Sequence, residues 1–256
     1  MQHQRLKTTA GTLTVPVLDT EATSKLSITW HWSASSYTVT KYLKTRYHFV
    51  IDKHGKARHG VPVERNLNNK NQRRQAGYAA HVLNANSNNI GISAAAMGDA
   101  HENRARRGDY GSWPLTKAQI AGLVEVAAQL CYCYRIPVLP ARVLGHEEWD
   151  SILGRPQDRW DVNCIPHLDI RPHLNADGSY DSTNYLRQQV QRRVAELAVP
   201  DDPELRDKQL RAFGSFVTFH DQAYASRFPV ETIRTIKQLR QQAPLAGFSR
   251  DDLESA

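Results

Sequence analysis

The sequence has few cysteines, no long apolar run and no block of like charge. Three cysteines occur in 256 residues, and an odd number argues against a framework of disulfide bonds. No apolar stretch approaches the roughly 20 residues that a membrane-spanning helix needs, so no transmembrane segment is expected. The first ten residues contain no apolar signal core. If the protein acts outside the cytoplasm, we expect it to leave the cell by a route other than a signal peptide.

The cysteines are also not spaced as a set of metal ligands. Cys131 and Cys133 stand two apart in a stretch with helical periodicity, so they point to different faces of the helix. We interpret them as packing residues.

Positive charge is in excess, because 33 lysines and arginines against 26 acidic residues give a net charge of +7. Such a chain favours polyanions in general, whether nucleic acid, anionic lipid or anionic cell wall. The excess lies in the first 200 residues, since acidic and basic residues nearly balance from Asp201 onward. The sequence contains no zinc finger, no aromatic RNA-binding motif and no clear recognition helix, so we expect no specific nucleic-acid partner.

Several short segments have the pattern of β-strands. Residues 26–33 alternate between apolar and polar side chains, and His31 lies on the polar face near the end of the segment. Residues 47–52 indicate a second strand, with residues 60–64 expected as its hairpin partner. Residues 89–96 form an apolar run that is typical of a buried strand.

Two long helices are expected after these strands. Thr116 and Gln119 form a capping box, and the amphipathic stripe that follows ends near Pro137. A second helix is predicted over about residues 183–199. Strands mixed with long helices indicate an α/β fold in which a central mixed sheet is flanked by helices.

The length exceeds one domain of about 150–200 residues, so an appendage is expected. We predict one domain over residues 1–200 and a mostly helical C-terminal segment of unassigned role over residues 201–256. Residues 100–113 are rich in charge and glycine and are predicted to form a surface loop. Residues 147–160 are predicted to form an irregular, charged connection.

Two histidines and one aspartate are candidate metal ligands: His31, His146 and Asp161. Two imidazoles and one carboxylate suit hydrolytic zinc, because this set leaves a fourth position open, whereas structural zinc sites are closed by four ligands. Taken singly, each is an ordinary residue, and only a fold can bring together positions so far apart. The evidence for a metal site therefore comes mainly from the residues around each candidate.

Six short motifs occur around these positions. They are His-Trp-Ser-Ala-Ser at 31–35, Tyr-His-Phe-Val-Ile-Asp-Lys-His-Gly at 47–55, His81 with Asn-Ser-Asn-Asn-Ile-Gly-Ile at 86–92, Pro-Leu-Thr-Lys-Ala-Gln at 114–119, Gly-His-Glu at 145–147, and Arg-Trp-Asp at 159–161. In this order they resemble the zinc-dependent N-acetylmuramoyl-L-alanine amidases of type 2, whose fold is shared by phage lysozyme-amidases and peptidoglycan recognition proteins. The resemblance covers roughly residues 26–172.

The resemblance implies that His31, His146 and Asp161 bind a zinc ion. A zinc ion held in this way lowers the pKa of water and polarises an amide carbonyl. The implied activity is hydrolysis of the amide bond between N-acetylmuramic acid and L-alanine in peptidoglycan. The interval between His146 and Asp161 is longer than in many members, and the usual Asp-Pro-Gly ending is replaced by Asp-Val-Asn.

The resemblance also implies roles for three residues outside the ligand set. It places Tyr47 beside the zinc water, where a phenol can orient the water or donate a hydrogen bond to the oxyanion. Arg159 stands where the family usually has lysine, and it would stabilise the oxyanion with a planar fork in place of a point charge. His81 is implied to lie near the substrate cleft and to contact the glycan or peptide.

The neighbours of the implied ligands are interpreted as structural. His48 follows Tyr47 and is expected to point to the opposite face of its strand as a buried residue. Glu147 and Glu148 follow His146, and one of them could hydrogen-bond a ligand imidazole. Solvent exposure is the simpler expectation for both glutamates.

The function expected from these residues is that of a lytic peptidoglycan amidase similar to an endolysin. The alternative is a peptidoglycan-binding module or a virion-associated component without strong catalysis, because some proteins of this fold lose the third ligand and only bind muropeptides. The location expected is the host cytoplasm with release to the wall by a separate holin, or the virion. A cytoplasmic recycling enzyme is a further alternative, and the oligomeric state is left open.

Overall fold

The structure of the protein is a computed structural model that describes residues 1–67 and 77–198. A compact unit runs from Met1 to Val194, and the metal-site candidates all belong to it. The predicted helical segment at 201–256 and the predicted domain boundary at residue 200 lie outside the described residues.

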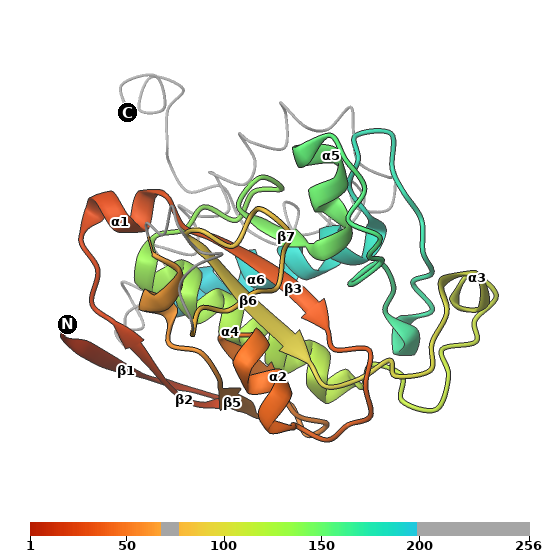
Figure 1. Ribbon diagram of the computed structural model, residues 1–256, viewed down its shortest axis with the longest axis horizontal. Coiled ribbons are helices and arrows are strands. Elements are labelled where there is room, and N and C mark those ends of the chain that lie inside the picture. The colour runs from red at the N-terminus through yellow and green to blue at the C-terminus, as the bar shows by residue number, and fades with distance from the viewer. Residues whose placement is uncertain (68–76, 199–256) are drawn as a thin grey trace, which may run out of the picture. The chain divides into compact units, whose positions relative to one another are not determined.

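A five-stranded mixed sheet forms the centre of this unit (Figure 1). Its strands, in spatial order, are β5 (Ala57–His59), β4 (Phe49–Ile51), β6 (Asn89–Ala94), β3 (Ser27–Trp32) and β7 (Val143–Gly145). Strands β4, β6, β3 and β7 run parallel, while β5 pairs antiparallel with β4. The predicted α/β class, a mixed sheet flanked by helices, is confirmed.

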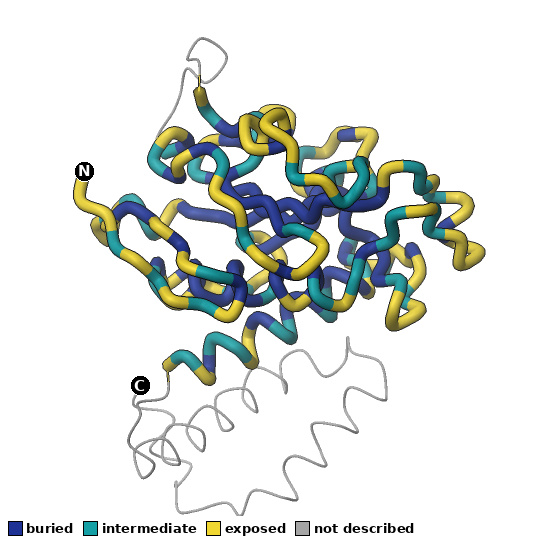
Figure 2. The backbone as a smooth tube through the Cα atoms, turned by 90° about the horizontal axis from the view of Figure 1, so that it is seen from below, coloured by how far each residue is buried: buried dark blue, intermediate teal, exposed yellow. Residues whose placement is uncertain are grey.

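Every residue of strand β3 is buried, and both of its edges are paired because it lies between β6 and β7. Its polar face, which the alternation marks out, is covered by other polar groups. Thr29 donates a hydrogen bond to Asn89 at 2.9 Å and accepts one from the indole of Trp149 at 3.0 Å. The period-2 pattern therefore records buried polar side chains next to His31, and Figure 2 shows that the central strands are buried.

The predicted hairpin after β4 is shifted in the structure. The backbone amides of Gly60 and Val61 donate to the carbonyls of His48 and Tyr47, as the prediction requires. The pairing however begins earlier, at Ala57 in β5, and residues 63–66 leave the sheet as the 3-10 helix η1 (Val63–Asn66). The prediction of residues 60–64 as the partner strand is thus wrong by several residues.

The two long helices are found where the sequence predicts them. Helix α4 (Lys117–Tyr134) begins with the capping box of Thr116 and Gln119, in which both reciprocal hydrogen bonds form, and it packs on β4 and β6. Helix α6 (Asp181–Ala198) lies with α4 behind the sheet in the view of Figure 1. Arg193 of α6 and Glu125 of α4 form an ion pair at 2.7 Å that links the two helices.

Shorter elements connect these parts. They are β1 (His3–Thr8), β2 (Gly11–Pro16), α1 (Thr20–Ser24), α2 (Lys41–Arg46), α3 (Glu102–Ala105), η3 (His146–Glu148), α5 (Trp149–Leu153) and η4 (Pro166–Leu168). The antiparallel hairpin of β1 and β2 was not predicted from the sequence. The irregular connection predicted for residues 147–160 is wrong in its first half, where η3 and α5 form.

The described cysteines behave as packing residues. Cys131 is buried, Cys133 is half-buried, and all three thiols of the described chain are free. None of the helices in the described ranges is both long enough and apolar enough to cross a membrane.

Candidate metal centre and active site

Two of the candidate ligands meet because their strands are parallel neighbours. His31 lies at the carboxyl end of β3, and His146 directly follows the carboxyl end of β7. Trp30 of β3 is in register with Gly145 of β7, so the residues that follow each emerge at the same edge of the sheet. The imidazole rings of His31 and His146 lie 4.7 Å apart between centroids.

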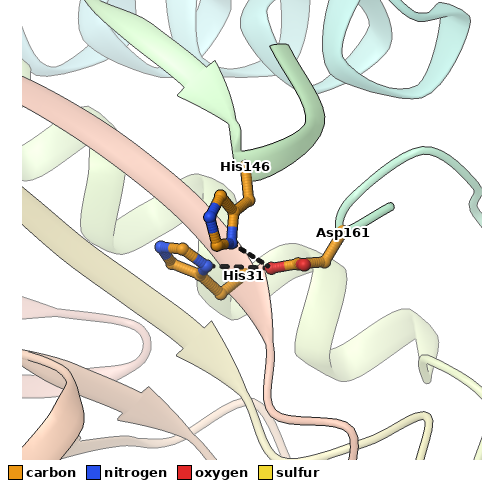
Figure 3. Close-up of side chains that lie close together, drawn as sticks. All are labelled: His31, His146 and Asp161. Atoms are coloured by element: carbon orange, nitrogen blue, oxygen red, sulfur yellow. Dashed lines mark hydrogen bonds and ion pairs between the residues drawn. The ribbon is translucent and has the colours of Figure 1, made fainter. Parts of the chain in front are cut away.

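Asp161 completes the group from a loop that returns to this edge. Its backbone carbonyl accepts a hydrogen bond from the amide of Glu147 at 3.0 Å, which ties the loop to the turn that carries His146. Its Oδ2 lies 2.8 Å from Nδ1 of His31 and 3.4 Å from Nδ1 of His146 (Figure 3). All three side chains are buried, and their candidate ligand atoms lie within 4.8 Å of one another.

A chain of hydrogen bonds fixes the tautomer of His31. Nε2 of His81 lies 3.2 Å from the carbonyl oxygen of Asn89, and a carbonyl can only accept, so this nitrogen carries a proton. Nδ1 of a neutral His81 is then an acceptor, and Nε2–H of His31 donates a hydrogen bond to it across 3.0 Å. A neutral His31 is left with an unprotonated Nδ1 that faces Asp161.

Burial is the main cause of the charge states of the two imidazoles. Burial lowers the pKa of His31 to about 4, and burial together with the nearby His31 lowers that of His81 well below its ordinary value, so both imidazoles are neutral near pH 7. Burial alone would raise the pKa of Asp161, but His146 and His31 hold it below its ordinary value. The carboxylate is therefore ionised.

This set of atoms fits a cation. An unprotonated Nδ1 of His31 and a carboxylate oxygen of Asp161 are both acceptors, yet they face each other at 2.8 Å. With Nδ1 of His146 near the same oxygen, the group provides two nitrogen ligands and one oxygen ligand. Neutral imidazole and carboxylate are the ligand types of catalytic zinc sites, which keep a fourth position open.

Tyr47 lies beside this group. Its ring centroid is 5.1 Å from that of His31, and its side chain is half-buried at the C-terminal end of α2. Burial, followed by the negative charge of Asp161, raises the pKa of Tyr47 above its ordinary value. The phenol is therefore protonated and available as a hydrogen-bond donor.

Arg159 is exposed in the structure. Its guanidinium donates a hydrogen bond to the carbonyl of its neighbour Asp158 at 3.0 Å. The next residue, Trp160, packs edge-to-face on Trp32, with ring centroids 4.7 Å apart. This aromatic pair brings the chain back toward β3 just before Asp161, while Arg159 keeps its charge on the solvent side.

His81 is buried behind His31, with 8% of its surface exposed. Both of its ring nitrogens are bonded within the protein. Gly91 makes room for the ring, because a Cβ there would lie 2.8 Å from the imidazole. The predicted substrate contact of His81 stays a prediction, and its hydrogen bonds show a second use as the acceptor that holds His31. His48 is buried as predicted and accepts the amide proton of Gly91.

The two glutamates after His146 are buried, so the expectation that they are solvent-exposed is wrong. Both oxygens of Glu148 accept hydrogen bonds from Arg187 at 2.8 Å, and one also accepts the amide proton of Gly145. Both oxygens of Glu147 lack a hydrogen-bond partner within the described chain. Sequence reasoning missed Arg187, although Thr183 and Arg187 share an i, i+4 face of α6, a spacing that hints at a common role.

Two imidazoles and a carboxylate at the carboxyl edge of an α/β sheet are typical of metal-dependent hydrolases. The comparison with protein families is more specific: a family model described as N-acetylmuramoyl-L-alanine amidase matches residues 12–162, more than half of the chain. The chain therefore belongs to the N-acetylmuramoyl-L-alanine amidase family, as its motifs predicted, and is an amidase-type hydrolase with peptidoglycan as its substrate class. No curated protein and no solved structure shows significant similarity to the chain.

Proposed function

We propose that the protein is a zinc-dependent hydrolase that cuts the amide bond between N-acetylmuramic acid and L-alanine in peptidoglycan. The observation that supports this most directly is the pair of facing acceptors, Nδ1 of His31 and Oδ2 of Asp161, in a buried group that also contains His146. Two acceptors in contact are unfavourable unless a positive charge lies between them. The family match supports the choice of bond, because the matching family is described as N-acetylmuramoyl-L-alanine amidase.

In this proposal His31, His146 and Asp161 hold the zinc ion. When bound, zinc would polarise the scissile carbonyl and acidify the attacking water. His81 accepts a hydrogen bond from Nε2–H of His31 and so keeps the proton of the neutral imidazole on Nε2. Nδ1 of His31 therefore carries no proton and can bind the metal. The burial of all three ligands excludes competing water and strengthens their electrostatic interactions.

Tyr47 and Arg159 act on the reacting group in this proposal. The protonated phenol of Tyr47 donates a hydrogen bond to the tetrahedral oxyanion, which develops negative charge only as the amide is attacked. Arg159 contributes positive charge from the rim, where substrate binding would remove water from the exposed guanidinium. Neither role requires the side chain to change its protonation state.

The test is a digest of purified peptidoglycan, analysed by mass spectrometry with and without a chelator. The proposal expects intact glycan strands and released stem peptides that begin with a free L-alanine amine. It further expects that the chelator stops the release and that added zinc restores it. Cleavage within the glycan, or an unchanged digest in the presence of the chelator, would contradict the proposal.

We infer that the substrate in the cell is the polymeric wall, as for an endolysin. The net charge of +7 supports this inference, because a basic protein is attracted to an anionic wall. Rates on intact sacculi and on a soluble muropeptide separate the alternatives. A lytic enzyme digests sacculi efficiently, whereas a recycling enzyme prefers the soluble fragment. A binding module would sediment with sacculi and release no peptide.

A further inference from the structure

Helix α6 lies beyond the part of the chain that matches the amidase family, which ends at residue 162. Its first two turns nevertheless contact the two segments that carry the candidate ligands His146 and Asp161. One contact reaches the turn of His146, and the other reaches the residue after Asp161. Arg187 of α6 also reaches β7, and α5, α6 and β7 are neighbours in the view of Figure 1.

The contact with the His146 turn is a buried ion pair. Arg187 donates to both carboxylate oxygens of Glu148 at 2.8 Å and also to the carbonyl of Val143 in β7 at 3.0 Å. Thr183 donates to the same carboxylate at 2.7 Å. Glu148 in turn accepts the amide proton of Gly145 at 2.9 Å, so the turn on both sides of His146 is tied to α6.

The contact with the Asp161 segment is made by Ser182, which is fully buried. Its hydroxyl donates to the carbonyl of Val162 at 2.6 Å. The amide of Glu147 completes the connection by donating to the carbonyl of Asp161. Neighbouring residues of one helix thus restrain His146 and Asp161 together.

We propose that Arg187 is a positioning residue for the metal centre, acting through Glu148 on the turn that presents His146. The inference rests on the proposed zinc site. A buried ion pair contributes little to stability on its own, because removing both charges from water costs about as much as their attraction returns. A planar, two-pronged contact does fix orientation, however, and the orientation of a ligand decides how well it binds a metal.

The test compares two conservative variants of the same helix. Arg187→Lys keeps the charge but loses the two-pronged contact with Glu148. Arg193→Lys is the matched control, because Arg193 forms its ion pair with Glu125 of α4, away from the ligand turns. The measurements are zinc affinity by competition with a chelator, the visible spectrum of the cobalt-substituted protein, and thermal unfolding of the metal-free protein.

We expect Arg187→Lys to weaken zinc binding by about 10- to 100-fold and to change the cobalt spectrum, as is typical for residues that orient metal ligands. Arg193→Lys should keep the parental values for both. Parental affinity and spectrum in Arg187→Lys would overturn the inference and leave the proposed function intact. A parent protein that binds no zinc would overturn both.

A double variant covers the case in which Arg187→Lys does not fold. Arg187→Met combined with Glu148→Gln removes both charges and leaves no unpaired ion in the interior. The inference expects weakened zinc binding here as well, because the turn of His146 loses the two-pronged contact with Arg187 and keeps only the hydrogen bond from Thr183 of α6. A folded double variant with parental zinc affinity would overturn it.

Discussion

The three candidate ligands are held in two different ways. His31 belongs to the central strand β3, where backbone pairing with β6 and β7 fixes its position on both sides. His146 and Asp161 belong to turns. Their positions are fixed by side chains of α6 and by the backbone hydrogen bond between Glu147 and Asp161. One ligand is therefore positioned by the sheet, and two are positioned by specific side-chain contacts.

The two ways of holding a ligand differ in how general they are: strand pairing is common to all parallel sheets, whereas the side-chain contacts are particular to this chain. Parallel strands bring His31 and the start of the His146 turn to one edge whatever their side chains are. The final orientation of His146 and Asp161 depends on a few polar contacts, each of which one substitution can remove. The position of the sheet-held ligand should tolerate side-chain changes around it, although its tautomer depends on His81, whereas the positions of the turn-held ligands should not.

The largest effect is expected from removing a turn-held ligand. Asp161→Ala should abolish amide hydrolysis and sharply weaken zinc binding, because the anionic oxygen between two imidazoles is lost. Zinc content after dialysis and the rate of peptide release measure the two effects. The control is Asp158→Asn, which neutralises an exposed carboxylate three residues earlier. Stoichiometric zinc in the Asp161 variant would remove this residue from the ligand set.

A smaller effect is expected from Tyr47→Phe, which leaves every candidate ligand in place. Losing one hydrogen bond to an oxyanion costs on the order of 100-fold in turnover, so the variant should be slow and still bind zinc normally. Tyr42→Phe is the matched control, since Tyr42 is exposed on the same short helix. Equal turnover in the Tyr47 variant and its control would show that the phenol has only a packing role.

Local patterns predicted the regular part of the molecule. Alternation located β3, an apolar run located β6, and the capping box of Thr116 located the start of α4. These succeed because each depends on residues close in sequence. The motifs around His31, His146 and Asp161 also placed these residues in one site, and the structure does bring them together.

The parts that local patterns did not predict depend on contacts between distant residues. Glu148 was expected in solvent, because no residue near it in the sequence indicates an ion-pair partner. Its partner, Arg187, comes from a helix almost forty residues later. The partner strand of β4 was predicted at residues 60–64, but β5 ends before Gly60. The amide of Gly60 still donates a hydrogen bond to the carbonyl of His48, although Gly60 is not part of the strand. The hydrogen bond of His81 to His31 crosses fifty residues and leaves no periodic signal.

The sheet-held ligand has one side-chain support of its own, which gives the third prediction. His81→Phe keeps a ring behind His31 but removes the acceptor for Nε2, so the tautomer is no longer fixed. Zinc affinity should fall by about 10- to 100-fold. His48→Phe is the control, because His48 is equally buried but bonds to the amide of Gly91. A matching loss of affinity in both variants would point to packing as the cause.

The smallest effect is expected from Arg159, which lies on the rim and is held by neither the sheet nor α6. Since its guanidinium is exposed, solvent screens its charge, and Arg159→Ala should lower kcat/KM by about tenfold, or about 1.4 kcal/mol of transition-state stabilisation. Arg159→Lys should stay near the parent if charge alone matters. If lysine fails as badly as alanine, the planar fork instead binds a carboxylate of the substrate. Steady-state kinetics on a soluble muropeptide separates these outcomes, and parental kinetics in the alanine variant would place Arg159 outside the active site.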